Sequence, residues 1–419
     1  MPNLKIWKNR QEWMTILPFI FFGFITQIIS ILHAPSKTIS NSPYAFCNYY
    51  INKLNIFNVH IDCDAQYFLL DSQNPMRMLN GQSLLLDRPL HSFIVFILSK
   101  VFNLVGIPSG PITYLGADGI PQTYDLLNYA IFIGLNAIIL FASMLLALKV
   151  MLRSRVMGNR YSKIILVASL VMIVQNPINR EFFWTPHSQM FNILIPCLIF
   201  YLLQEKFVIT KRRYLVLMIL ISALLLIYPL FFLVIPIFFI KTLRFLGKTK
   251  AILISITTLP KLLWPSILSF LGGTYDIATF DDNRRFVWVI DSLESKSLTK
   301  DLVHNGLLLL QSLPGMWVIV FLIIIILGLL GVATHQAQSG FLKTQYFRDS
   351  VLVFGIYFLA IALIGEYFPR FSTGPVILLA LLILKETVVI PRFARYQLVL
   401  YLALISANSW FWVSMWRRT

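Results

Sequence analysis

The sequence predicts an all-α, polytopic transmembrane protein with about 11 spans, and two observations predict this class. Hydrophobic residues make up 58% of the chain and charged residues 13%, and the mean hydropathy is +0.75, so the chain carries more apolar surface than a soluble core could bury. Apolar runs near the roughly 20 residues that cross a bilayer recur throughout, and none shows the alternation of a barrel strand. We therefore expect a single integral membrane domain over residues 1–419, with lipid as part of its solvent.

Short basic clusters separate the apolar runs. The runs cover residues 17–32, 126–150, 164–174, 190–203, 214–240, 251–270, 316–332, 351–364, 375–384 and 398–413. Basic residues within 5–10, 153–163, 206–213 and 241–250 contribute to the net charge of +17, and the positive-inside rule assigns these clusters to the cytoplasm. We expect an uncleaved first span, a location in a plasma or inner membrane, and no nucleic acid partner.

The run 91–104 is expected to lie along the membrane interface. It is short and contains Lys100 and Asn103. Counting it as a crossing would place the basic cluster 153–163 outside, against the charge rule. We therefore expect an interfacial helix within a first extracytoplasmic loop that covers residues 33–125.

The run 214–240 has basic clusters at both ends and contains Pro229 and Pro236. One straight helix would place one of these clusters outside. Two short spans that meet near Tyr228 keep both inside, and broken helices occur at membrane depth where they line a cavity. We favour the broken pair, and we expect a further extracytoplasmic loop over 272–305.

Acidic and imidazole side chains gather in the first outer loop, where His60, Asp62 and Asp64 follow one another closely. A carboxylate here could deprotonate a hydroxyl or amine acceptor, or it could hold a divalent cation. The alternative is that both aspartates only cap the helix that follows them. Cys47 and Cys63 share this loop and could form a disulfide in an oxidising compartment.

The second outer loop, 176–189, is short but rich in polar residues. Glu181 could supply another carboxylate, and His187 could act as a proton shuttle or a metal ligand. The alternative is that Trp184 anchors the interface and that Arg180 pairs with Glu181.

Two further cations accompany apolar runs. Arg370 precedes the run 375–384 and could bind phosphate as a bidentate pair, or it could only snorkel at the end of a helix. Lys261 lies inside the run 251–270 and would cost about 2.5 to 3.5 kcal/mol at the bilayer centre, so we expect it to face a cavity or the interface.

Several short motifs together match one known layout. They are Asp62 and Asp64 soon after the first span, Tyr67, Gly81, Arg88-Pro89-Leu90, Tyr228-Pro229 with Pro236, and Pro369-Arg370-Phe371 with Pro375. In this layout the chain resembles the C-type glycosyltransferase superfamily, which consists of integral membrane enzymes that move a sugar from a polyprenyl-phosphate carrier to an acceptor outside the cytoplasm. Many members carry adjacent acids where this chain has Asp62-Cys63-Asp64, and an aspartate in the second outer loop where this chain has Glu181 and His187.

The resemblance implies an inverting displacement in which Asp62 or Asp64 takes the proton of the acceptor as it attacks the anomeric carbon. The leaving group would be a polyprenyl phosphate or diphosphate. Arg370, with Arg88 or Lys261, would stabilise the charge that develops on this phosphate.

The resemblance also implies where the lipid and a metal ion would bind. The polyprenyl tail would enter near the broken pair of helices, which makes Tyr228 a candidate substrate contact. A divalent cation, Mg, Mn or Zn, would be held by Asp62 and Asp64, together with His60 or Glu181.

Other functions remain open from the sequence. An envelope polysaccharide polymerase or ligase would depend on basic residues and on His91 or His187 instead of the two aspartates. A lipid-linked transporter or flippase would show inverted repeats and polar groups in mid-span, and the sequence shows no such symmetry. Walker, dinucleotide-binding, His-Glu-x-x-His and Gly-x-Ser-x-Gly motifs are missing, which excludes the corresponding enzyme classes.

Overall fold

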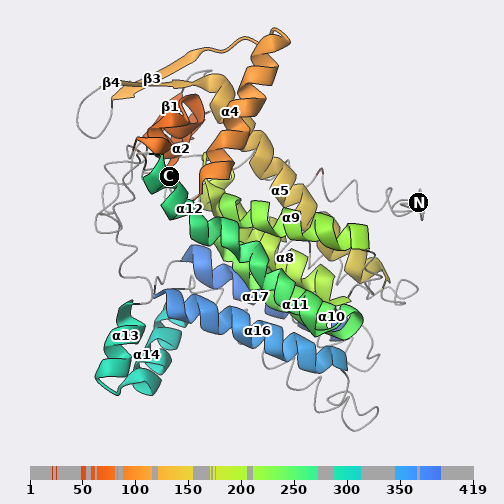
Figure 1. The fold of residues 1–419 in the computed structure, drawn as a ribbon. Coiled ribbons are helices and arrows are strands. Elements are labelled where there is room, and N and C mark those ends of the chain that lie inside the picture. The colour runs from red at the N-terminus through yellow and green to blue at the C-terminus, as the bar shows by residue number, and fades with distance from the viewer. Residues whose placement is uncertain are drawn as a thin grey trace.

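The computed structural model is a bundle of helices with a smaller layer of short elements at one end (Figure 1). It describes residues 21, 25, 49–52, 58–61, 64–80, 83, 88–115, 121–153, 170, 173, 174, 176–204, 211–271, 287–312, 345–365 and 369–387. Of the interpretable residues, 85% are helical, which confirms the mainly helical class that the composition predicts.

Two of the described helical stretches, Leu126–Met151 and Lys248–Phe270, are long and apolar enough to cross a membrane. Shorter apolar helices occur at Pro89–Leu104, Ser188–Leu203, Tyr214–Ile227 and Phe371–Ile383. These findings are compatible with a protein that associates with a membrane.

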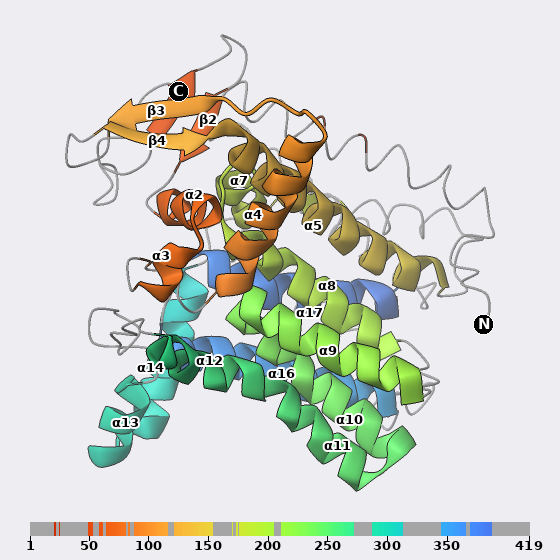
Figure 2. The same cartoon turned by 45° about the horizontal axis from the view of Figure 1, so that its top comes forward.

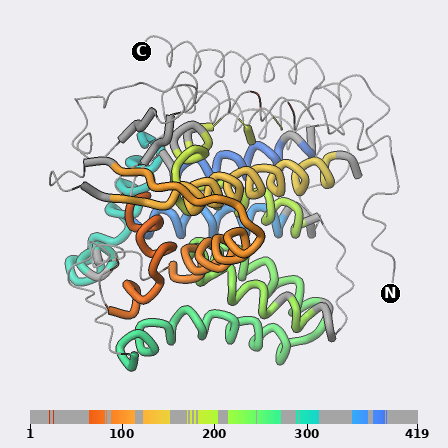
Figure 3. Tube along the Cα trace, turned by 90° about the horizontal axis from the view of Figure 1, so that it is seen from above, coloured from red at the N-terminus to blue at the C-terminus, as the bar shows by residue number. Residues whose placement is uncertain are grey.

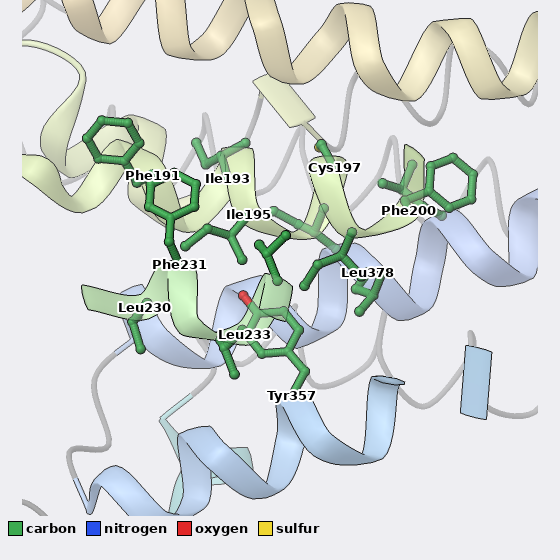
Figure 4. Close-up of a cluster of buried hydrophobic side chains, with 14 of the residues drawn as sticks. Phe191, Ile193, Ile195, Cys197, Phe200, Leu230, Phe231, Leu233, Tyr357 and Leu378 are labelled. Atoms are coloured by element: carbon green, nitrogen blue, oxygen red, sulfur yellow. The ribbon is translucent and has the colours of Figure 1, made fainter. Parts of the chain in front are cut away.

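Helix α8 (Phe191–Gln204) is the central helix of the bundle, packed against α5 (Leu126–Arg153) and α17 (Pro369–Thr387). Apart from Asn192 and Gln204 it is apolar on all its faces, and such a helix is expected to be buried on every side. Ile193, Cys197 and Phe200 are each 0% exposed. Figure 4 shows this core, with Tyr357 of α16 (Gln345–Ile364) pointing toward α8.

The chain breaks at Tyr228, between α9 (Lys211–Ile227) and a 3-10 helix, η3 (Pro229–Val234), that leads into α10 (Ile235–Leu246). Tyr228 is extended, with φ −152° and ψ 116°, because a residue before proline is disfavoured in the helical region. The helix break that we expect near Tyr228 and Pro229 is therefore present.

The start of α9 and the end of α10 lie at the same end of the bundle. Gly247, at φ +88°, forms the one-residue link from α10 into α11 (Lys248–Ser255), which continues through η4 (Ile256–Thr258) into α12 (Leu259–Phe270). The Tyr214 hydroxyl donates to the Lys250 carbonyl, and Ser222 Oγ donates to the Thr257 carbonyl at 2.9 Å, so α9 and α11 run in the same direction. Figure 3 shows α11 and α12 along one side of the bundle and α5 on the other.

Basic side chains tie the helices together at this end, which we call the basic end and define by Lys149, Lys241 and Arg244. Lys149 Nζ donates to the Tyr201 hydroxyl at 3.1 Å, and Lys241 Nζ donates to the Leu203 carbonyl, also at 3.1 Å. Arg244 forms a bidentate pair with Asp349 at the start of α16. The ends of α5, α8 and α10 therefore meet where the sequence carries its basic clusters.

The described residues between 49 and 125, within the expected first extracytoplasmic loop, form a layer of their own (Figure 2). Its helices are α2 (Ala65–Gln73), α3 (Met76–Leu79) and α4 (Pro89–Leu104), and α4 covers the expected interfacial run. The loop also contains two antiparallel pairs, β1 (Tyr49–Asn52) with β2 (Asn58–Ile61) and β3 (Pro111–Leu115) with β4 (Pro121–Asp125). These hairpins correct the purely helical prediction for this loop.

The described residues of the two later segments that we expect to be extracytoplasmic, 176–189 and 272–305, are mainly helical. Helix α7 (Pro177–Phe182) and the 3-10 helix η2 (Ser188–Met190) lead into α8. Helices α13 (Val287–Glu294) and α14 (Leu298–Gln311) lie beside the end of α16, where Trp288 Nε1 donates to the Leu363 carbonyl at 3.0 Å.

Candidate functional site

Segments far apart in the sequence meet at the end of α8 opposite the basic end. The cluster, which we call the outer site, contains Asp64 at the start of α2, Arg88 before α4, His187 before η2, and Tyr228 at the break after α9. The structure thus brings together residues that the sequence singled out separately.

Asp64 and His187 form a carboxylate–imidazole pair in the outer site. Asp64 Oδ2 lies 3.0 Å from His187 Nε2, across 123 positions of sequence. The carboxylate side chain is 48% exposed, whereas the His187 side chain is 1% exposed. Asp64 stands at the N-cap position of α2 without a side-chain capping bond, so capping alone does not describe its role.

The loop that carries His187 is anchored on α5. Asn136 Nδ2 lies 3.0 Å from the carbonyl oxygens of Phe182, Phe183 and Thr185. The Tyr129 hydroxyl donates to the Trp184 carbonyl at 2.6 Å. These contacts hold a non-helical stretch of backbone against a rigid helix, which fixes where His187 stands.

Arg88 forms the basic part of the outer site. Its Nη1 donates to Ser188 Oγ at 2.9 Å, and its guanidinium carbon lies 5.6 Å from the ring centroid of Tyr228. A guanidinium over an aromatic face is attracted by the ring quadrupole, so the Tyr228 ring helps to position Arg88.

The hydroxyl of Tyr228 is engaged within the protein. It donates toward Gln189 Oε1 and Asn192 Oδ1, both at 3.0 Å, and Asn192 Nδ2 donates to Gln189 Oε1 at 2.7 Å. Tyr228 is 2% exposed. We therefore assign Tyr228 a supporting role beneath Arg88.

His91 lies in an aromatic pocket formed by Phe68, Phe132 and Phe191, with ring centroids 5.2 to 5.7 Å away. Within the described residues, neither ring nitrogen of His91 has a hydrogen-bond partner. Burial, with smaller contributions from the neighbouring His187 and Arg88, lowers the pKa of His91 to about 3, so the ring stays neutral. It acts as packing below the outer site.

A buried acid, Asp71, lies near the outer site, in α2. Asp71 is fully buried, accepts a hydrogen bond from Ser83 Oγ, and lies 3.7 Å from Arg77 Nε. Burial raises the pKa of Asp71 to about 6, although the Ser83 hydroxyl and Arg77 oppose this shift. Asp71 therefore joins the segment before Arg88 to α2.

The remaining sequence candidates are not in the described part of the outer site. Lys261 is partly buried on α12. Residues or side chains that fall outside the described part of the chain are Cys47, His60, Asp62, Cys63, Glu181 and Arg370.

The expected metal site falls largely among these residues. In the described part of the chain, no group of three His, Cys, Asp or Glu side chains could hold a metal ion. Of the expected ligands, only Asp64 has a described side chain.

Sequence reasoning missed the residues that support the outer site. Ser188, Asn192 and Asn136 all make structural hydrogen bonds in it. Asn136 and Asn192 lie inside apolar runs, and polar residues within such runs usually face the protein interior. That signal could have identified them.

Comparison of the chain with models of protein families, with curated proteins and with solved structures finds no match.

Proposed function

We propose that this protein is a multi-pass membrane glycosyltransferase. It transfers a sugar from a polyprenyl-phosphate or polyprenyl-diphosphate donor to an acceptor on the extracytoplasmic side. The observation that carries the proposal is the Asp64 carboxylate, which is half exposed, held 3.0 Å from the buried His187, and placed in one cluster with Arg88. A base for an acceptor hydroxyl and a cation for a phosphate are the groups that this reaction requires.

The proposed topology has about 11 spans and rests on charge. The basic end, with Lys149, Lys241 and Arg244, would face the cytoplasm. The outer site lies at the other end of α8, so it would face the extracytoplasmic side of a plasma or inner membrane. The apolar stretches Leu126–Met151 and Lys248–Phe270 support crossings there.

Asp64 would accept the proton of the acceptor hydroxyl as that oxygen attacks the anomeric carbon from the face opposite the leaving group. The new glycosidic bond forms as the bond to the carrier phosphate breaks, which inverts the anomeric centre. Arg88, with Arg370 and Lys261 as further candidates, would stabilise the negative charge that stays on the carrier phosphate. Exposure of Asp64 and burial of His187 favour the carboxylate as the group that meets the acceptor.

A divalent cation would fit the chemistry of the acidic segment, because carboxylate and imidazole are its usual ligands. Asp62, Asp64 and His60 would hold it, and when bound it would add positive charge near the phosphate. The proton transfer to Asp64 does not require it.

An envelope polysaccharide polymerase or ligase is the second candidate, because Arg88 and His187, which such an enzyme would use, lie in the same cluster. It differs from the first candidate in not requiring Asp64.

The test is consumption of a panel of radiolabelled polyprenyl-phosphate and polyprenyl-diphosphate sugars by the purified full chain, with heat-inactivated protein as the blank. Consumption of one donor with release of the carrier phosphate supports the proposal. The matched variants are Arg88→Ala and Lys100→Ala, both cations at or on α4, of which only the first should lower the rate. If no donor is consumed by the wild type, the glycosyltransferase proposal fails.

A further inference from the structure

We infer that His187 is a positioning residue for Asp64: its imidazole is fixed with the proton on Nε2, and this N–H holds the carboxylate in place. The inference rests on the proposed function only for the claim that Asp64 is the base. According to this inference, His187 does not contact the substrate.

The tautomer follows from the hydrogen bonds. The backbone N–H of Gln189 donates to His187 Nδ1 at 3.1 Å, and a backbone amide can only donate. Nδ1 therefore carries no proton in this geometry, so the neutral ring carries its proton on Nε2. Nε2 in turn lies 3.0 Å from Asp64 Oδ2 and donates to it.

Aromatic packing prevents the ring from turning. The His187 centroid lies 5.2 Å from that of Phe68 and 5.0 Å from that of Phe182. Phe68 belongs to the first turn of α2, directly after Asp64, so one helix supplies both the carboxylate and a wall of the imidazole pocket. A ring that is 1% exposed in this pocket cannot reach a substrate, whereas the half-exposed carboxylate can.

The short turn 187–189, which carries His187, also connects Asp64 to Arg88. Gln189, whose backbone fixes His187, accepts from the Tyr228 hydroxyl through its side chain, and Tyr228 lies under Arg88. Ser188, between His187 and Gln189, accepts from Arg88 directly. The turn 187–189 thus sets the position of Asp64 and of Arg88 relative to each other.

Substitutions of His187 separate a positioning role from a reactive one. The amide nitrogen of Gln reaches about as far as Nε2, whereas that of Asn reaches only as far as Nδ1. With a consumed donor, His187→Gln should keep most of kcat, while His187→Asn and His187→Phe should lose about 100-fold in kcat with little change in KM. Equal losses for Gln and Asn in protein that is as thermally stable as the wild type would overturn the inference.

A second measurement requires no substrate. The chain has 6 histidines, and nitrogen-15 NMR of histidine-labelled full-length protein in nanodiscs reports the tautomer of each. The signal of His187, identified by its loss in His187→Gln, should show a protonated Nε2 and an unprotonated Nδ1, and the Nε2 resonance should move in Asp64→Asn. A proton on Nδ1, or a resonance that Asp64→Asn leaves in place, contradicts the inference.

The two measurements fail separately. The predicted tautomer without consumption of any donor would leave the positioning role standing and would refute the glycosyltransferase. Consumption that requires Asp64 together with the wrong tautomer would leave the glycosyltransferase standing and would refute the role of His187.

Discussion

Substitution of Gly374 on α17 tests the packing that holds the outer site. A Cβ added at this position would lie 2.2 Å from the Tyr357 hydroxyl oxygen, 3.1 Å from its Cζ and 3.4 Å from the carbonyl oxygen of Asn192. Ordinary contacts between nonbonded heavy atoms lie near about 3.5 Å, so Gly374→Ala must displace a fully buried tyrosine. Overpacking of this kind destabilises by about 2 to 3 kcal/mol, or about 2 to 3 °C in apparent melting temperature for a chain of 419 residues.

Tyr357→Phe should rescue this variant. Removal of the hydroxyl oxygen leaves the ring carbon at 3.1 Å as the nearest atom, which a small shift of the ring can relieve. We therefore expect the double variant to recover about half of the loss or more. The assay is thermal unfolding of the detergent-solubilised protein, with Gly355→Ala as the control, since an added Cβ there meets nothing within 4 Å. The reasoning is refuted if Gly374→Ala has the same melting temperature as Gly355→Ala, or if adding Tyr357→Phe to Gly374→Ala does not raise the melting temperature.

Three further substitutions test separate parts of the structure. His91→Phe should preserve sugar transfer and should not lower the melting temperature, because no described residue hydrogen-bonds its ring; loss of transfer in stable protein would favour the polymerase or ligase. Asp71→Asn should become more stable relative to the wild type as pH rises through about 6. The reason is that a carboxyl whose pKa is raised in the folded protein stabilises the wild type fully only below the pKa of the unfolded chain. This stabilisation is lost once the pH exceeds the pKa of the folded protein. The gain should reach about 2 to 3 kcal/mol between about pH 4 and about pH 8, measured from the difference in melting temperature between variant and wild type at each pH, and a difference that does not change with pH would contradict it. Arg244→Ala should destabilise by about 2 kcal/mol because it leaves the Asp349 carboxylate buried, and Asp349→Ala in that background should recover part of the loss; purely additive losses would refute the pair.

Elements that depend on local pattern could be predicted from the sequence. The apolar runs correspond to α5, α8, α16 and α17, and the helix break at Tyr228 follows from the proline after it. The run 91–104, which we expect at the membrane interface, corresponds to α4. These features could be predicted because the length of an apolar run and the presence of a proline determine the conformation of neighbouring residues.

The short hairpins of the first outer loop could not be predicted in the same way. Strand β1 and strand β3 are only 4 and 5 residues long, and the surrounding composition indicates loop as readily as strand. Pairing with a partner strand, which the sequence pattern does not specify, decides their conformation.

The residues of the outer site could be predicted from the sequence, but their geometry could not. Asp64 stands out as an acid in the first expected loop, and His187 as a polar residue just before the run 190–203, yet nothing local pairs positions that are 123 residues apart. The support from Asn136 and Asn192 depends on which helices pack together. Burial of His187 and exposure of Asp64, which divide their roles, also arise from that packing.

The central claim is tested most directly by Asp64→Asn. Asp125→Asn is the matched control, because Asp125 lies in the same loop and its carboxylate accepts from the Leu127 amide at 2.8 Å, a bond that Asn retains. On the donor that the wild type consumes, we expect Asp64→Asn to lower kcat by about 100-fold or more at unchanged expression and melting temperature, and Asp125→Asn to transfer at the wild-type rate. Transfer by Asp64→Asn at the wild-type rate would contradict the account.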